Sequence, residues 1–345
     1  MSGLRALSVA QVDALFAPFE GAERLLIAVS GGPDSTALLL MAAEWAERRG
    51  ATSIEAATVD HALRPESAAE ASDVAALCQR LGLNHRTLVW KGAKPSTRLQ
   101  ERAREARYRL LITHARACRA DALMTAHHAD DQAETVLLRL LRGSGVGGLR
   151  GIDERSARDG VVIARPLLSV SKAELVAFVQ ARGVAYVEDP SNADPRFART
   201  RLRAMLGEFA REGLDARALA RLARRAGEAE EALTKAAADC EARLGATGEI
   251  DANALYEAPI AIVQRILSRR IAAAGGGDPS RVGLEKIEAL AARLTQALNG
   301  RRAVSANVGG AIARLDTKGR LTFAPEPPRR SAAALRVPRR EAIAD

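Results

Sequence analysis

One segment near the N-terminus constrains the fold more than any other. Residues 24–29 (RLLIAV) are apolar and partly β-branched, and residues 30–35 (SGGPDS) form a polar glycine-containing turn directly after them. An apolar, alanine-rich segment begins at Thr36. This order predicts a buried strand, a tight loop and a helix. Such a loop directs several backbone N–H groups and a helix N-terminus at one point, which is typical of a phosphate site.

Strand-like and helix-like segments alternate after this loop. Strands are predicted at residues 53–59, 85–90 and 121–126, and a helical pattern follows each of them. The alternation predicts an α/β fold with a doubly wound, mostly parallel, Rossmann-like sheet. Ligands of such sheets bind beyond the carboxyl ends of the strands, where the polar motifs of this chain occur.

The pattern changes in the second half of the chain. Residues 215–298 are almost wholly helical in pattern, and three short strand-like segments follow. The last residues are rich in proline and arginine, which is typical of a flexible tail. We therefore predict a catalytic domain at residues 1–214, a mainly helical C-terminal domain at 215–325 and a flexible tail at 326–345.

Charge and cysteine content narrow the classes of protein. Lys and Arg number 51 against 42 Asp and Glu, which gives a net charge of +9 and a pI near 10.0. Such a balance favours a polyanionic partner, although an ordinary basic surface also produces it. The three cysteines are scattered, which disfavours a disulfide framework, a zinc knuckle or an iron–sulfur cluster. We see no signal-peptide pattern and no membrane-length apolar run, so we expect a cytoplasmic protein.

The glycine loop lacks the lysine of a Walker loop and the spacing of a dinucleotide fingerprint. Its glycines allow the backbone to close on phosphates, and its two serines can donate hydroxyls. An acidic side chain suits a metal better than a phosphate, so Asp34 is predicted to hold a Mg²⁺ that bridges ATP. The alternative is an ordinary strand–helix turn in which Asp34 caps the helix. The predicted ATP-binding residues of the loop are Ser30, Gly31, Gly32, Pro33, Asp34 and Ser35.

A second polar motif, residues 127–135 (HHADDQAET), follows the strand at 121–126 and opens a helix. Asp130 and Glu134 are four residues apart, which places both on one helical face. The adjacent His127 and His128 cannot chelate a metal as a helical His-x-x-x-His pair does. Asp131 and Glu134 also fit a capping box, which would only start a helix. This motif by itself supports a capping role and a chemical role equally.

The motifs taken together resemble a known family. The glycine loop is similar to the pyrophosphate loop (PP-loop) of the N-type ATP pyrophosphatases, and the full set resembles the tRNA(Ile)-lysidine synthetases from about residue 24 to 206. That family attaches lysine to C2 of the wobble cytidine of an isoleucine tRNA with a CAU anticodon, through an adenylated cytidine, and releases AMP and pyrophosphate. The matching segments are residues 30–35 (SGGPDS), 60–64 (DHALR), 103–108 (ARxxRY), 127–135, 137–149, 165–167 (RPL) and 189–199.

The resemblance implies roles for individual residues. Asp130 and Glu134 would bind the cationic lysine substrate and help to remove its proton, and Arg107 would stabilise charge that develops during the reaction. Asp60 and His61 would contact the nucleoside part of ATP, mainly through their backbone. The catalytic residues are thus predicted to be Asp34, Arg107, Asp130 and Glu134. Judged without the family, Arg107 is better explained as part of a solvated helix face.

Arginines are concentrated next to this predicted site. Residues 196–225 contain nine arginines and only three acidic residues, which suits the backbone of an RNA, although some of them would be ordinary surface charges. The family pattern has an asparagine where this chain has Thr200, so a side-chain role there is in doubt. The region 251–298 is expected to pack, to form a homodimer or to gather the tRNA. The predicted tRNA-binding residues are Arg104, Arg199, Arg203, Arg217, Arg221 and Arg224.

Three other functions fit parts of the pattern. A tRNA thiolase of the same loop family also adenylates tRNA, but it usually relies on cysteines near the site, and no cysteine here follows a predicted strand. Amide formation, as in NAD or GMP synthetases, does not suit the motif at residues 189–203. A non-catalytic tRNA-binding protein would not need Asp34, Asp130 and Glu134 intact.

Overall fold

The computed structural model divides into two compact units, Met1–Gly227 and Glu228–Asp345. The boundary lies within a helix, whereas the sequence-based division was placed at residue 214, before that helix. No helix of the described chain is long and apolar enough to cross a membrane. The structure describes residues 6–63, 66–92, 94–95, 97–187, 198–245, 248–277 and 282–327, without the side chains of 198–200 and 204.

The first unit is built on one six-stranded sheet with the order β3-β2-β1-β4-β6-β5. The first four strands pair in parallel, β6 continues them, and only the edge strand β5 is antiparallel. This confirms the predicted α/β fold with a mostly parallel sheet. The strands are β1 (Arg24–Ala28), β2 (Ser53–Asp60), β3 (Asn84–Val89), β4 (Ala122–Met124), β5 (Arg155–Arg158) and β6 (Val161–Ala164).

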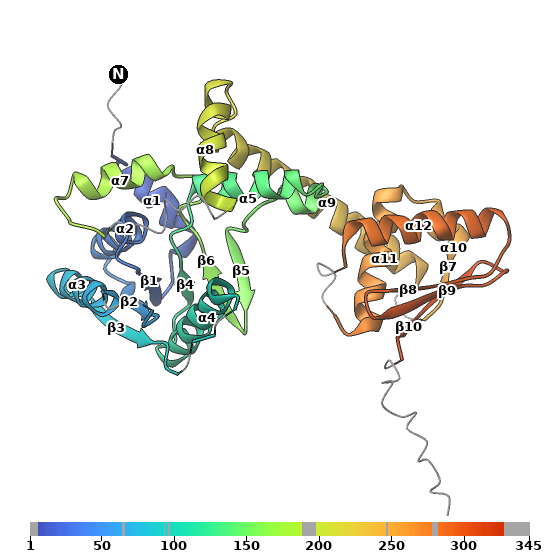
Figure 1. Cartoon of the computed structure of the whole chain (residues 1–345), viewed down its shortest axis with the longest axis horizontal. Helices are drawn as coiled ribbons and strands as arrows, with labels where there is room; N and C mark the ends of the chain where they lie inside the picture. Colours follow the sequence, from blue (N-terminus) through green and yellow to red (C-terminus); the bar gives the residue numbers. More distant parts are fainter. Residues whose placement is uncertain are drawn as a thin grey trace, which may run out of the picture. The chain divides into compact units, whose positions relative to one another are not determined.

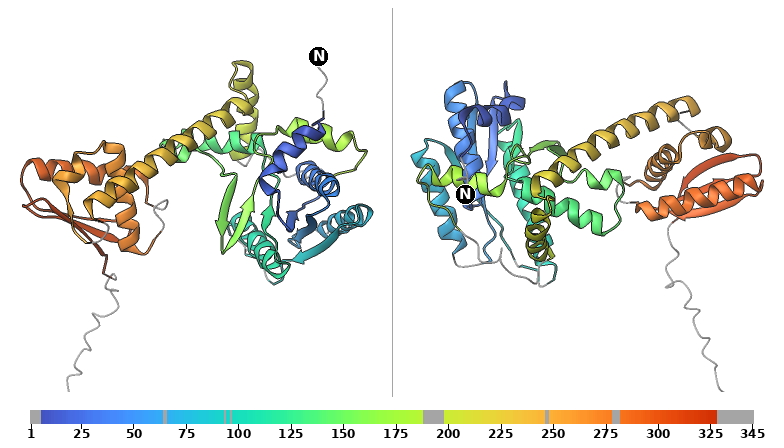
Figure 2. Two further views of the ribbon diagram at one scale, coloured as in Figure 1. Left: turned by 180° about the vertical axis from the view of Figure 1, so that it is seen from behind. Right: turned by 90° about the horizontal axis from the view of Figure 1, so that it is seen from above.

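Helices cover both faces of this sheet (Figures 1 and 2). The alternation of β1 explains the two layers, because successive side chains of a strand point to opposite faces. Leu25 and Ile27 pack with α1, α2 and α7, whereas Leu26 and Ala28 pack with α4. The helices are α1 (Val9–Phe16), the 3-10 turn η1 (Ala17–Phe19), α2 (Pro33–Arg49), α3 (Ser67–Arg80), α4 (Leu99–Ala117), α5 (Ala129–Leu141), α6 (Val146–Leu149), α7 (Lys172–Gln180) and α8 (Ala198–Arg211).

Two short elements were not predicted from the sequence. The segment that was expected to be a glycine loop, residues 143–151, contains the one-turn helix α6. The polar strand β5 (RSAR) has no apolar alternation, and it forms because its backbone pairs with β6 across a hairpin. Elements this short depend on their neighbours rather than on their own sequence.

The second unit combines helices with a four-stranded antiparallel sheet of order β7-β10-β9-β8. The three predicted strands are present, and the two-residue strand β7 adds to them. Its core is aliphatic, from α11, α12 and the inner face of the sheet. The elements are the C-terminal half of α9 (Ala216–Leu244), β7 (Ile250–Asp251), α10 (Ala252–Tyr256), α11 (Ile260–Gly275), α12 (Leu284–Asn299), β8 (Val304–Val308), β9 (Ala311–Leu315) and β10 (Arg320–Pro325). Residues 328–345 of the predicted tail lie outside the described residues.

Candidate active site at the carboxyl ends of the strands

The glycine loop connects β1 to the N-terminus of α2. Gly31 has φ +86°, a conformation that favours glycine, and an added Cβ would lie 3.3 Å from Val74 Cγ2. The hydroxyls of Ser30 and Ser35 are 3.1 Å apart, and Ser35 Oγ also donates to the carbonyl of Gly32 at 3.1 Å. These bonds hold the loop in shape while the first N–H groups of α2 remain directed at its concave side, as an anion site requires.

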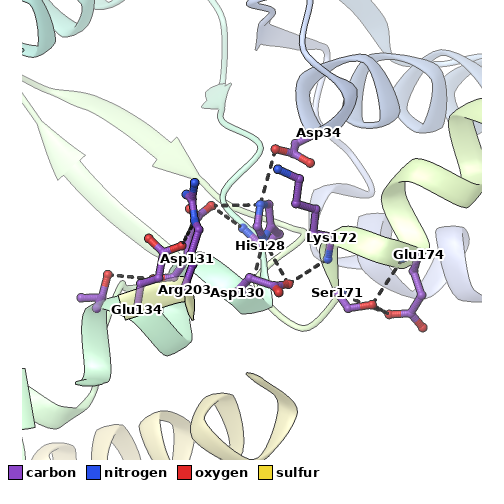
Figure 3. Close-up of polar contacts among 10 residues, drawn as sticks. Asp34, His128, Asp130, Asp131, Glu134, Ser171, Lys172, Glu174 and Arg203 are labelled. Carbon is purple, nitrogen blue, oxygen red and sulfur yellow. Dashed lines mark hydrogen bonds and ion pairs between the residues drawn. The ribbon is translucent and has the colours of Figure 1, made fainter. Parts of the chain in front are cut away.

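Asp34 lies in the first turn of α2 and faces α5 across the site (Figure 3). Its Oδ2 is 3.4 Å from His128 Nε2, and its Oδ1 is buried without a hydrogen-bond partner among the described residues. A carboxylate oxygen without a donor suits a hard cation, because Mg²⁺ prefers oxygen ligands. Asp34 therefore fits the predicted metal role better than the role of a simple helix cap.

The sequence did not predict a role for His128 in the site. His128 precedes α5, only 4% of its surface is exposed, and its ring nitrogens lie 3.4–3.5 Å from carboxylate oxygens of Asp34, Asp130 and Asp131. Burial alone lowers the pKa of His128, but hydrogen bonds to Asp130 and Asp34 and the charge of Asp131 raise it to about 10. When His128 is protonated, its positive charge holds the three carboxylates together. When the ring is neutral, Nδ1 accepts a hydrogen bond from the backbone N–H of Asp130 and so caps the N-terminus of α5.

Asp130 and Glu134 share a helix but contact different partners (Figure 3). Asp130 Oδ2 accepts the backbone N–H of Lys172 at 2.8 Å. Burial raises the pKa of Asp130, but hydrogen bonds from His128 and from that N–H lower it below its usual value. Glu134 is 1% exposed, and its Oε1 accepts from Arg203 Nε on α8. The helical spacing predicted a shared face, but not the arginine that contacts Glu134.

A cavity of about 1300 Å³ joins most of these groups. One wall is formed by the glycine loop and Asp34, and another is apolar, with Ala57, Val59 and Leu111. Some of the predicted site residues line this cavity: Ser30, Gly32, Pro33, Asp34, His61, Arg107 and Arg203. Others do not line it: Gly31, Ser35, Asp60, Asp130, Glu134 and Arg104. His128, Asp131 and Lys172 line it without having been predicted to do so.

The neighbours Asp60 and His61 have different environments. Asp60 Oδ1 accepts from Ser67 Oγ and from the N–H of Ala62, both at 2.7 Å, so its side chain stabilises the turn before α3. The bond from Ser67 is the main reason why the pKa of Asp60 is lowered. His61 lines the cavity and packs edge-to-face with Trp90, with 6.0 Å between the ring centroids. Its buried Nδ1 has no hydrogen-bond partner among the described residues. Burial and the charges of Arg107 and Lys94 lower the pKa of His61, so it is neutral near pH 7.

The two arginines on α4 differ in environment. Arg107 is half-buried and lines the cavity, and burial together with the charge of Arg104 lowers its pKa. Arg104 is exposed and lies over the ring of Tyr108, 5.2 Å from its centroid.

Lys172, at the start of α7, extends its side chain toward Asp34 (Figure 3). Two cationic side chains, Arg107 and Lys172, therefore line the cavity.

The arginines predicted to bind tRNA are distributed over three helices. On α9, Arg217, Arg221 and Arg224 are exposed, and Arg217 pairs with Glu174 at 2.6 Å. The opposite face of α9 is buried through Leu219 and Ala223 against α5. The side chains of Arg199 and Thr200 and the motif at residues 189–197 lie outside the described residues, so the predictions made on them are untested.

Comparisons with known proteins identify the class of the fold. The fold and the loop define a PP-loop ATP-binding protein, since the model of the PP-loop domain matches residues 5–209. A U34-tRNA thiolase from Methanococcus maripaludis has the same fold over 59% of this chain and 71% of its own, with a TM-score of 0.51 and 16% identity.

Curated relatives define the family more narrowly. The tRNA(Ile)-lysidine synthase of Rhodopseudomonas palustris is 47% identical, over 96% of this chain and 99% of its own. That of Methylobacterium nodulans is 49% identical, over 89% of this chain and 91% of its own. The chain belongs to the tRNA(Ile)-lysidine synthase family and is an ATP-using enzyme.

Proposed function

We propose that the enzyme ligates lysine to C2 of the wobble cytidine of the CAU-anticodon isoleucine tRNA. The cavity carries this proposal, because it joins the glycine loop to Asp34, His128 and Asp131, and His128 in turn contacts Asp130 behind the cavity wall. In the first step the C2 oxygen of cytidine attacks the α-phosphorus of ATP, and pyrophosphate leaves. In the second step the ε-amine of lysine attacks C2, and AMP leaves with that oxygen.

The residues of the cavity suit the first step. The glycine loop and the N-terminus of α2 would hold the departing pyrophosphate, and the apolar wall suits the adenine ring. Asp34 would hold a Mg²⁺, which supplies charge neutralisation on the phosphates when bound. Arg107 would stabilise charge at the α-phosphate, since its guanidinium stays cationic even in a half-buried position.

The acidic residues of α5 suit the second step. The lysine substrate arrives as a cation and must lose a proton before its amine can attack. Asp130 and Glu134 are our candidates for binding it, and Asp131 offers a further carboxylate at the cavity wall. Glu134 already contacts Arg203, so lysine would have to share this carboxylate or displace the guanidinium. The tRNA would approach along the arginines of α9, while the second unit retains its predicted role in packing, dimerisation or tRNA gathering.

Incorporation of labelled lysine tests the function directly. Purified enzyme, ATP, Mg²⁺, labelled lysine and the CAU-anticodon isoleucine tRNA should yield labelled tRNA, AMP and pyrophosphate. The methionine tRNA with the same anticodon serves as the control and should remain unlabelled. If ATP is converted to AMP while no label enters either tRNA, the ligation proposal is wrong and thiolation becomes the better explanation.

We expect Glu134→Gln to separate binding from chemistry. The variant keeps the size of the side chain but removes its charge, so tRNA binding should remain normal while lysine transfer falls by about 100-fold or more. Single-turnover assays with preformed enzyme–tRNA complex measure the transfer step. Glu208→Gln, on an exposed position of α8, is the matched control. Loss of tRNA affinity in Glu134→Gln would instead assign the residue a structural role.

The exposed arginines of α9 should control tRNA affinity. Replacement of Arg217, Arg221 and Arg224 by alanine should weaken binding and reduce the slope of log affinity against log salt by about one per lost phosphate contact. The charge-matched control replaces Arg48, Arg49 and Arg80, at the C-terminal ends of α2 and α3. Equal salt slopes for the two triple variants would exclude the α9 arginines from the interface.

A further inference from the structure

A second cluster of ligating side chains lies on the α4 face of the sheet, and none of its members lines the cavity. Glu55 is the third residue of β2 and shares a face with Ala57, which packs against α4. His114 lies in the last turn of α4, and Cys118 directly follows this helix. One ligand atom of each side chain lies within 4.8 Å of the others, so an imidazole, a carboxylate and a thiol converge on one point.

The contacts within this cluster leave ligand atoms unsatisfied. Glu55 Oε1 lies 2.8 Å from His114 Nε2, but the contact lacks the angles of a hydrogen bond, and the buried Nε2 has no hydrogen-bond partner among the described residues. The thiol of Cys118 donates to the carbonyl of Ala115 at 3.5 Å, a weak hydrogen bond that a metal–sulfur bond would replace. The guanidinium of Arg24 donates to the backbone carbonyl of Cys118 rather than to its sulfur. Both Glu55 and His114 are 17% exposed, so solvent does not replace these contacts fully.

We propose that Glu55, His114 and Cys118 form a site for a divalent metal ion of the zinc class. Sulfur, imidazole nitrogen and carboxylate oxygen together select Zn²⁺ over Mg²⁺ or Ca²⁺, which prefer oxygen alone. Bonds of about 2.0–2.3 Å in a tetrahedron place ligand atoms roughly 3.5 Å apart, so a small contraction of the cluster completes three positions. Water takes the fourth position, and the Cys118 thiol releases its proton as the metal–sulfur bond forms.

This site is separate from the catalytic cavity. None of its three side chains lines the cavity, although Ala57, two residues after Glu55 on β2, and Leu111, three residues before His114 on α4, belong to the apolar wall of the cavity. The metal would fasten the C-terminal end of α4 to β2, and the same helix carries Arg107 into the cavity. The site thus stabilises the packing of α4 and takes no part in ligand chemistry.

Cobalt substitution reports on the predicted sulfur ligand. The full-length enzyme is treated with a chelator and titrated with Co²⁺ in excess Mg²⁺, which occupies oxygen-only sites. The expected result is a sulfur-to-cobalt charge-transfer band that saturates at one Co²⁺ per chain and disappears when Zn²⁺ is added. Cys118→Ser should abolish the band, and His114→Ala should weaken Co²⁺ binding by about 100-fold or more. Cys240→Ser, in the second unit, is the matched control and should retain it.

Thermal unfolding gives an independent measurement. Zn²⁺ should raise the melting temperature of the wild-type enzyme and of Cys240→Ser but not of Cys118→Ser, because a ligand stabilises only the state that binds it. A wild-type enzyme without a sulfur-to-cobalt band would overturn the proposal, and so would a band that persists in Cys118→Ser. Circular dichroism of each variant confirms that the fold is intact. Neither measurement depends on lysine transfer, so failure here leaves the proposed function untouched.

Discussion

Replacement of Asp34 by asparagine is expected to lower the rate of ATP-dependent AMP formation by about 10³-fold. The asparagine keeps the shape of the side chain but loses the negative charge that would hold Mg²⁺ against the phosphates. Oδ1 of Asp34 is buried without a hydrogen-bond partner among the described residues and is open to a metal, while Oδ2 lies 3.4 Å from His128 Nε2. Release of pyrophosphate and AMP in single-turnover assays measures the loss, and a higher Mg²⁺ concentration should restore little of it.

The control for Asp34→Asn is Asp73→Asn, an exposed carboxylate on α3 whose loss should leave the rate unchanged. Thermal stability should be close to wild type in Asp73→Asn and lower in Asp34→Asn, because the His128 imidazolium loses one of its three carboxylates there. AMP formation at the wild-type rate in Asp34→Asn would remove this residue from the catalytic machinery. The helix-cap interpretation of Asp34 would then be the better one.

Replacement of His128 by glutamine should change how stability depends on pH. The pKa of His128 is raised to about 10 in the folded state, against an ordinary value near 6.5. A raised pKa stabilises the folded state fully below pH 6.5, and this contribution is lost as pH rises toward about 10. The wild-type enzyme should therefore lose up to a few kcal/mol of unfolding free energy over that range, and His128→Gln should lack this decline.

Urea unfolding at a series of pH values measures the effect, as the difference between wild type and variant. His85→Gln is a suitable control, since burial lowers the pKa of His85 and leaves it neutral above pH 6.5 in both states. Its pH profile should follow that of the wild type across the same range. Parallel profiles for wild type and His128→Gln would mean that His128 is a neutral helix cap rather than the cation among three carboxylates.

Much of the fold could be predicted because its signals are local. The apolar run at residues 24–29, the glycine loop and the alanine-rich helix form one strand–loop–helix unit, and the later strands repeat this order. Parallel strands joined by helices bring their carboxyl ends to one edge, so the polar motifs after β1, β2 and β4 had to meet there. Strand β5 and helix α6 escaped prediction because their few residues carry no periodic pattern.

The contacts within the candidate site depend on distant parts of the chain. Glu134 could be placed on a helix face from its spacing, but its partner Arg203 comes from α8, 69 residues later. Asp130 accepts the N–H of Lys172, which is 42 residues away. Neither contact could be predicted from neighbouring residues in the sequence, because side chains of separate elements meet only when the whole unit has packed.

The sequence by itself determined the α/β class, the family and the position of the glycine loop, because each of these depends on residues that are neighbours in the chain. Only the tertiary structure decided the electrostatics of the site. It placed His128 among three carboxylates, where their combined charge outweighs the cost of burying a cation. It also brought Glu55 to His114 and Cys118 on another face of the sheet. Both arrangements arise from the packing of helices on strands, which fixes distances that the sequence does not contain.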